Sequence, residues 1–171
     1  MKTIIQRVLN CKLEAKNIAD TFEKCLISHT SSRSYKPVSQ IEKGIVVFLG
    51  IQKGDTEKDA EVLCEKILNL RIFEDESRKM NLSLKNISGE IMIVSNFTIC
   101  SNTKHGRRPS FECAAPPETA KKLYENFCEN MNKIYVPEKV KTGRFGSEMK
   151  ITIINDGPVN IIIESIEGKI N

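Results

Sequence analysis

The segment Ile45-Val46-Val47-Phe48-Leu49-Gly50-Ile51 is an unbroken apolar run, and it limits the folds that this chain can adopt. A strand with apolar residues at successive positions has both of its faces covered, which is typical of a central strand in a sheet. A second strand is expected at Ile91–Ile99, and it starts with a similar run, Ile91-Met92-Ile93-Val94, but becomes polar at Ser95. These runs predict a sheet that is buried in the middle of the protein.

Two amphipathic segments predict helices that pack on this sheet. The first can be capped by Asp55 or Thr56, and the second is expected to start at Ala115-Pro116-Pro117, because proline is tolerated in a first helical turn. Their apolar residues recur at helical spacing, at Ala60, Leu63, Cys64, Ile67 and Leu68 and at Ala120, Leu123, Tyr124, Phe127, Cys128 and Met131. Further strands are expected at Thr3–Val8, Arg71–Phe73, Met149–Ile154 and Val159–Ser165, so the predicted fold class is α/β.

One domain is expected for residues 1–171, because this length is usual for a single core. The least regular part is Ala15–Gln40, which we predict to be an insertion with an extended, Ser-rich loop. Within it, Ile18–Ile27 could form a short helix or strand. The turn residues Asn155-Asp156-Gly157-Pro158 separate the last two predicted strands.

Composition excludes several classes of protein. With 40% hydrophobic and 28% charged residues the chain is expected to be globular, and a net charge of +4 does not by itself indicate nucleic acid. The apolar runs are far shorter than the roughly 20 residues that span a bilayer, and the N-terminal residues lack an apolar signal core. We therefore expect no membrane association and a cytoplasmic location.

The cysteines do not form a Cys-x-x-Cys pattern, so no metal and no cofactor is predicted. Most of them are expected to be small core hydrophobes. Cys25 and His29 at i, i+4, and the loose group of Cys100, His105 and Cys113, leave a metal site as the minor alternative.

Polar residues at the end of the second apolar run suggest a site. Ser95, Asn96 and Thr98 interrupt an apolar strand, and they predict either a strand tip that borders a pocket or an ordinary hydrogen-bonded strand end. Neither His29 nor His105 is placed to serve as a base in a Ser-His-Asp arrangement. Any chemistry must therefore rely on positioned main-chain groups or on the substrate.

A basic loop, Lys104-His105-Gly106-Arg107-Arg108-Pro109, is a candidate for binding phosphates, and its alternative is a solvated surface loop. Lys141, Arg144 and Lys150 are further candidates.

Several short motifs extend over nearly the whole chain: Ile5-Gln6-Arg7-Val8, Leu68-Asn69-Leu70-Arg71-Ile72-Phe73, Lys79-Met80-Asn81-Leu82-Ser83, Val94-Ser95-Asn96-Phe97-Thr98, Arg108-Pro109-Ser110-Phe111, Thr142-Gly143-Arg144-Phe145-Gly146 and Asn155-Asp156-Gly157-Pro158-Val159. Their order and spacing resemble the D-aminoacyl-tRNA deacylase family, formerly called D-tyrosyl-tRNA deacylases. The resemblance implies hydrolysis of the ester between a D-amino acid, or glycine, and the terminal ribose of tRNA. This is a proofreading step in translation quality control.

The same resemblance implies a role for individual residues. Gly157 and Pro158, joined by a cis bond, would enter the pocket of the partner subunit and exclude L-amino acids. Main-chain groups of Ser95, Asn96, Phe97 and Thr98 would act as an oxyanion hole, with the 2′-hydroxyl of the tRNA in place of a protein base. Arg7 would support the Gly-Pro motif, and Ala114, Phe145 and Met149 would line or brace the pocket. The implied fold is a β-barrel-like sheet with flanking helices in a homodimer with composite sites.

The chain departs from the family at two hallmark positions. Asn96 stands where the family has Gln, and Asn160 stands where it has Thr. These departures motivate the alternative that the chain is a catalytically impaired relative that binds tRNA or DNA. A third alternative is a purely structural dimer.

Overall fold

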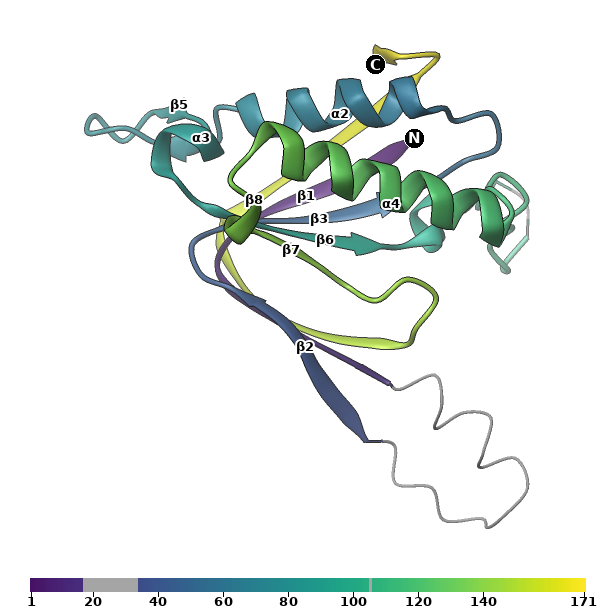
Figure 1. Ribbon diagram of the computed structural model, residues 1–171. Helices are drawn as coiled ribbons and strands as arrows, with labels where there is room; N and C mark the ends of the chain where they lie inside the picture. Colours follow the sequence, from purple (N-terminus) through teal and green to yellow (C-terminus); the bar gives the residue numbers. More distant parts are fainter. Residues whose placement is uncertain (17–33, 105) are drawn as a thin grey trace.

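The computed structural model describes residues 1–16, 34–104 and 106–171 (Figure 1). In chain order its elements are β1 (Lys2–Lys16), β2 (Tyr35–Ile41), β3 (Gly44–Gly50), α2 (Glu57–Asn69), β4 (Phe73–Glu74), β5 (Met80–Leu82), α3 (Leu84–Ile87), β6 (Glu90–Ser95), η2 (Phe97–Cys100), α4 (Pro117–Ile134), η3 (Pro137–Lys139), β7 (Val140–Thr142), β8 (Met149–Ile166) and β9 (Lys169–Ile170). The main sheet has the order β7-β6-β3-β1-β8-β9, and β2 pairs with β1. Helices α2 and α4 lie side by side on one face of this sheet (Figure 1).

The long strands β1 and β8 run through both parts of the sheet, the part that contains β3 and the part that contains β2. Residues 2–8 of β1 pair with β3, residues 11–16 pair with β2, and β8 runs antiparallel to both parts. Figure 1 shows that both strands bend away from the helices as they leave the sheet. The bend creates a concave side, and this is where the candidate site lies.

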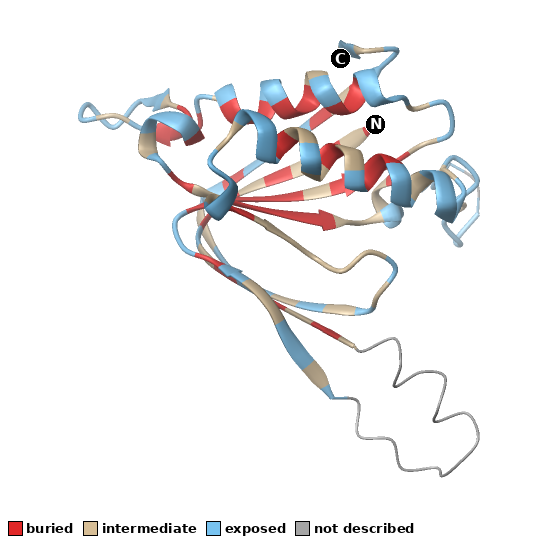
Figure 2. Cartoon of the chain, in the orientation of Figure 1, coloured by how far each residue is buried: buried red, intermediate tan, exposed pale blue. Residues whose placement is uncertain are grey.

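The buried apolar residues form two clusters, one on each side of the sheet. The cluster under the helices includes Leu63, Ile93 and Phe127, and Figure 2 shows buried residues on the sides of α2 and α4 that face the strands. The cluster on the concave side includes Leu13 and Met92. Strand β3 therefore contacts apolar layers on both faces, as its unbroken apolar sequence predicted.

Both predicted helices are present, and the structure decides how the first one begins. Thr56 is the N-cap of α2, and its N–H and its Oγ1 donate to Asp59 Oδ2 at 2.9 and 2.8 Å. Asp55 has another role, because its carboxylate accepts from Gln52 N at 2.6 Å and pairs with the N-terminal ammonium of Met1. Cys11, Cys64 and Cys100 are buried, as expected for small core hydrophobes.

The sheet is open, so the expectation of a barrel is wrong. Within the described residues, the short strands β7 and β9 end the two sides of the sheet and do not pair with each other. The strands predicted at Met149–Ile154 and Val159–Ser165 are one strand, β8, because β1 pairs with it on both sides of residues 156–159. The predicted turn is therefore a bulge inside a strand.

The predicted irregular insertion at Ala15–Gln40 is smaller than expected. Strand β1 runs to Lys16 and β2 starts at Tyr35, because these two segments pair with each other. The remainder of the insertion, residues 17–33, lies outside the described residues. No helix in the described parts of the chain is long and apolar enough to cross a membrane. The same residues contain no group of three or more metal-ligating side chains, while Cys25, His29 and His105 lie outside them.

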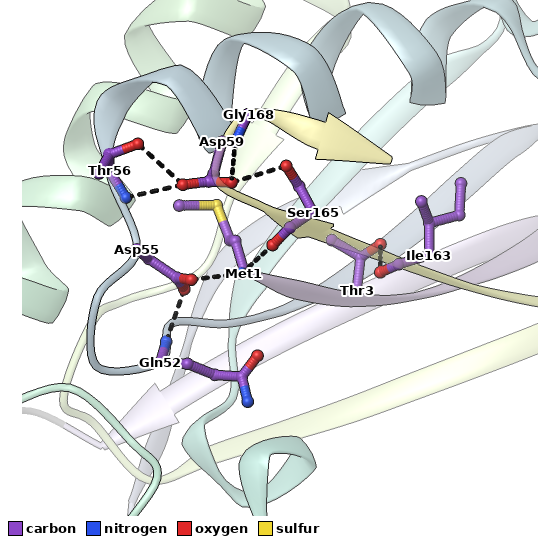
Figure 3. A network of polar contacts seen from close by, with 9 residues as sticks. All are labelled: Met1, Thr3, Gln52, Asp55, Thr56, Asp59, Ile163, Ser165 and Gly168. Atoms are coloured by element: carbon purple, nitrogen blue, oxygen red, sulfur yellow. Dashed lines mark hydrogen bonds and ion pairs between the residues drawn. The ribbon is translucent and has the colours of Figure 1, made fainter. Parts of the chain in front are cut away.

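A buried polar network joins α2 to the end of β8 (Figure 3). Asp59 Oδ1 accepts from Ser165 Oγ at 2.7 Å and from Gly168 N at 2.8 Å, and the side chain of Asp59 is fully buried. Burial alone would raise the pKa of this carboxyl group, but the hydrogen bonds from Gly168, Ser165 and Thr56 outweigh it and lower the pKa well below its usual range. Asp59 is therefore an ionised structural residue.

We expect the Asp59 network to make stability depend on acid pH. A carboxyl group with a lowered pKa in the folded state stabilises the protein above its unfolded pKa of about 3.9, and this contribution is lost as the pH falls further. Asp59→Asn should lower the free energy of unfolding by about 2–4 kcal/mol at pH 7, because donors lose their acceptor. Denaturant unfolding should show a smaller difference in the free energy of unfolding between the wild type and Asp59→Asn at pH 3 than at pH 7. A difference that does not depend on pH would contradict the assignment of Asp59 as an ionised residue.

Candidate active site

A cavity of about 840 Å³ opens beside the end of β6. Its walls come from the end of β6, from the segment that precedes α4, and from the segment between β7 and β8. The cavity gathers predicted residues that are far apart in the sequence, namely Ser95, Asn96, Phe97, Ala114, Phe145 and Met149. Apolar side chains such as Phe48, Val94 and Ile151 make up much of the remaining wall.

Asn96 ends strand β6 and starts the short 3-10 helix η2. Its N–H donates to Leu49 O at 2.8 Å, which is the last bond to β3. Its Oδ1 accepts from Thr98 N at 3.1 Å and from Thr98 Oγ1 at 2.6 Å, so the side chain caps the helix. The strand predicted to continue to Ile99 therefore stops at Ser95, because a capping asparagine turns the chain there.

The cap uses Thr98 N–H and leaves the N–H of Phe97, a lining residue of the cavity, without a bond to it. Thr98 N–H is bonded to Asn96, whereas Phe97 N–H, in the first turn of η2, has no acceptor among the described residues. The ring of Phe97 is 60% exposed and meets the ring of Phe111 edge to face, with centroids 5.2 Å apart. Phe97, a lining residue of the cavity, thus has a main-chain N–H without an acceptor among the described residues and an exposed aromatic ring.

Phe145 of the cavity wall is supported by Tyr124 of α4. Tyr124 packs against Phe145 with ring centroids 5.6 Å apart, and its hydroxyl donates to Ile93 O at 3.0 Å. Burial raises the pKa of Tyr124 far above its usual range, so it stays protonated. A Cβ atom on Gly143 would lie 2.9 Å from Met149 Sδ, so this glycine lets Met149 approach the wall.

The described lining residues offer few groups for acid-base chemistry. The charged ones are Lys53, Glu112 and Glu148, and Glu148 is held by Lys16 and by the hydroxyl of Tyr35. The expectation that main-chain groups would carry the chemistry stays a prediction.

The second predicted segment, Gly157-Pro158, does not line this cavity, and neither do Thr98 and Arg7. Gly157 and Pro158 are exposed in the bulge of β8, their peptide bond is cis, and Gly157 has a φ of +135°. A Cβ atom on Gly157 would lie 2.6 Å from Val159 N. Only glycine fits this position without a shift of the backbone.

Arg7 is buried beneath the bulge and holds its first residue. Its Nε donates to Asp156 O at 3.1 Å and lies 3.2 Å from Asp156 Oδ2, while its Nη1 donates to Ile72 O at 2.7 Å. The structure therefore places Arg7 next to the Gly-Pro motif, as the sequence resemblance implied.

The basic loop lies beside the cavity. Asn102 and Ser110 are bonded to each other through their backbones, so Lys104, Arg107 and Arg108 project as an exposed loop that leads to Phe111 in the cavity wall. Two of the other candidate cations have local partners: Arg144 Nη1 donates to Lys16 O at 3.3 Å, and Lys150 lies 3.9 Å from Glu14.

A comparison with known proteins identifies the family of this chain. The family model described as D-Tyr-tRNA(Tyr) deacylase matches residues 4–164. The chain belongs to this family. A D-aminoacyl-tRNA deacylase of Thermosipho africanus is 45% identical over 168 residues, which are 96% of this chain and 97% of the relative. One of Thermosipho melanesiensis is 54% identical over 130 residues, which are 76% and 86% of the two chains.

Solved structures agree with this family fold. The structure described as c-Myc DNA Unwinding Element Binding Protein has a TM-score of 0.83 and 38% identity, and the match covers 97% of this chain and 99% of the other. A probable eukaryotic D-amino acid tRNA deacylase has a TM-score of 0.71 at 15% identity, with 94% and 97% covered, which shows the fold alone.

Sequence reasoning missed part of the cavity wall. Phe48 was assigned to the buried core, and the cavity was not expected to reach it. Phe111 belongs to a motif that supported the resemblance but received no role. A large aromatic residue next to a run of basic residues was the signal that could have identified Phe111.

Proposed function

We propose that this protein hydrolyses the ester of D-aminoacyl-tRNA to free tRNA and a D-amino acid. Family membership over residues 4–164 supports the reaction class, and the names of the relatives supply the substrate. The observation that carries the proposal is the free N–H of Phe97 at an apolar cavity whose described lining residues include no acid-base pair of the Ser-His type. Translation proofreading takes place on tRNA, so we place the protein in the cytoplasm.

The chemical step follows from these groups. Water attacks the ester carbonyl carbon and gives its proton to the 2′-hydroxyl oxygen of the substrate, which passes its own proton on to the departing ribose oxygen, so no protein base is needed. Phe97 N–H stabilises the negative charge that develops on the carbonyl oxygen. The bond to the ribose oxygen then breaks, that oxygen takes up a proton, and the amino acid leaves as a carboxylic acid. Glycyl-tRNA is accepted too, because glycine has no side chain to exclude.

We infer that the active unit is a homodimer with composite sites. The filter residues Gly157 and Pro158 are exposed and lie outside the cavity of their own protomer. Exposed apolar side chains of Leu9, Ile154 and Ile162 surround the bulge, and Ile162 is 65% exposed. An apolar patch around a protruding motif is typical of an interface. In the dimer, Pro158 of one protomer enters the cavity of the other and excludes L-amino acids by contact.

The tRNA itself is bound by charge. Lys104, Arg107 and Arg108 are exposed on the loop that leads to Phe111 of the cavity wall, and in this proposal they bind the phosphates next to the terminal ribose. The whole chain acts as one deacylase domain in this proposal.

The second candidate function is binding of nucleic acid without catalysis. It is favoured by the 38% identical structure described as a DNA unwinding element binding protein, and by the departures at Asn96 and Asn160. The cap made by Asn96 argues against impairment, because it organises the same turn that bears Phe97 N–H.

The deciding experiment incubates the purified protein with D-tyrosyl-tRNA and, separately, L-tyrosyl-tRNA. We expect rapid loss of the D-ester and persistence of the L-ester. If both esters persist, the deacylase proposal is wrong. Activity that appears only after Asn96→Gln and Asn160→Thr would then identify an impaired relative, and salt-dependent retention of DNA would support the nucleic-acid-binding function.

A further inference from the structure

The bulge that carries Gly157 and Pro158 has two ends, and each end is held by a different residue of β1. Strand β1 pairs Val8 with Asn155 and Gln6 with Asn160. Arg7 alone therefore stands opposite residues 156–159, which bow out of the ladder. Arg7 holds the first end of the bulge through Asp156. At the second end, regular pairing resumes at Asn160.

The side chains of this second pair are bonded to each other. Gln6 Nε2 donates to Asn160 Oδ1 at 2.9 Å, and the two residues are direct partners in the β1-β8 ladder. Val159, between Pro158 and Asn160, is buried in the core. The chain that leaves Pro158 is thus fixed first by packing and then by an amide pair.

The Gln6-Asn160 bond contributes little to folding, because both side chains are accessible to water and would be hydrogen-bonded in the unfolded chain as well. It does fix a geometry, since a hydrogen bond between neighbouring strands is directional. A bond of this kind beside an exposed motif is better explained by positioning than by stability.

We propose that Gln6 and Asn160 are a positioning pair that, with Arg7, fixes the direction in which Pro158 projects and so sets the discrimination between D- and L-aminoacyl-tRNA. This inference rests on the proposed function, in which Pro158 is the chiral filter. It gives Asn160, a departure from the family's threonine, the role of acceptor for Gln6.

The test compares kcat/KM for D-tyrosyl-tRNA with kcat/KM for L-tyrosyl-tRNA. Both substrates carry the same RNA, so a change in RNA affinity cancels in this ratio. Asn160→Ala and Gln6→Ala should each lower the ratio about fivefold, mainly through faster hydrolysis of the L-ester. Asn160→Asp keeps an oxygen acceptor for Gln6 and should preserve the ratio. The matched control is Thr152→Ala, an exposed position of β8 on the other side of the bulge.

The double variant Gln6→Ala/Asn160→Ala should lose no more discrimination than either single variant, because one bond is removed in all three. An unchanged ratio, a parallel fall in both rates, or additive single effects would overturn the positioning role. Dimer content by analytical ultracentrifugation should be the same for all variants, and a lost dimer would assign the pair to the interface instead. A wild-type protein without D-tyrosyl-tRNA hydrolysis would overturn the proposed function and this inference together.

Discussion

Arg7→Ala is expected to lower kcat/KM for D-tyrosyl-tRNA by about a hundredfold, because in the proposed dimer Pro158 also forms part of the wall of the composite site, and a wall displaced by about 1 Å no longer holds the ester in its reactive position. Arg7 is 5% exposed and bonds both Asp156 and Ile72 O. Its removal leaves the buried carbonyl of Ile72 without this donor and frees the first end of the bulge. The free energy of unfolding should fall by about 2–3 kcal/mol, less than for a fully buried ion pair because Asp156 is partly exposed.

Steady-state kinetics and urea denaturation check both parts of this prediction. The control is Arg71→Ala, which removes an exposed arginine directly before Ile72 and should change neither quantity noticeably. If Arg7→Ala lost stability but kept full activity and discrimination, Arg7 would be a folding residue and its link to the Gly-Pro motif would be wrong.

Asn96→Ala is expected to lower kcat by about tenfold to a hundredfold with little change in KM. The variant loses the acceptor that holds Thr98 N and Oγ1, so the first turn of η2 no longer fixes the direction of Phe97 N–H. Stability should fall by about 1 kcal/mol, as for other lost N-caps. Single-turnover kinetics would separate the chemical step from binding.

Thr98→Ala separates this explanation from nucleophilic catalysis. Its main-chain N–H still donates to Asn96, so the cap survives and kcat should fall by no more than about threefold. A nucleophilic Thr98 predicts complete loss of hydrolysis in the same variant. That result would contradict the main-chain mechanism, whereas near-normal activity would exclude Thr98 as the nucleophile.

The helices and the central strand were predictable because their patterns are local. Leu63 and Ile67 recur at helical spacing and are buried in α2, and Phe127 and Met131 do the same in α4. The turn in the chain at Asn96 was harder to predict, because the apolar residues Phe97 and Ile99 also fit the alternation of a strand. The signal for the turn is a single side chain, that of Asn96, which caps η2 and so ends the strand.

The extent of the sheet was predicted less well. Pairing between strands is set by partners far away in the sequence, and a short apolar pattern does not reveal how far a ladder continues. For this reason β1 and β8 are longer than expected, and the sheet stays open where a barrel was predicted.

The sequence by itself determined the α/β class and the faces of the helices, and its family motifs predicted the candidate residues of the site. The tertiary structure decided where these residues lie. It joined Ser95, Ala114 and Phe145 in one cavity and placed Gly157 outside it. The physical reason is that the long ladder between β1 and β8 continues past the bulge, so Gly157 and Pro158 are held on an exposed surface and not folded back over their own cavity. Local sequence contains no information on that register.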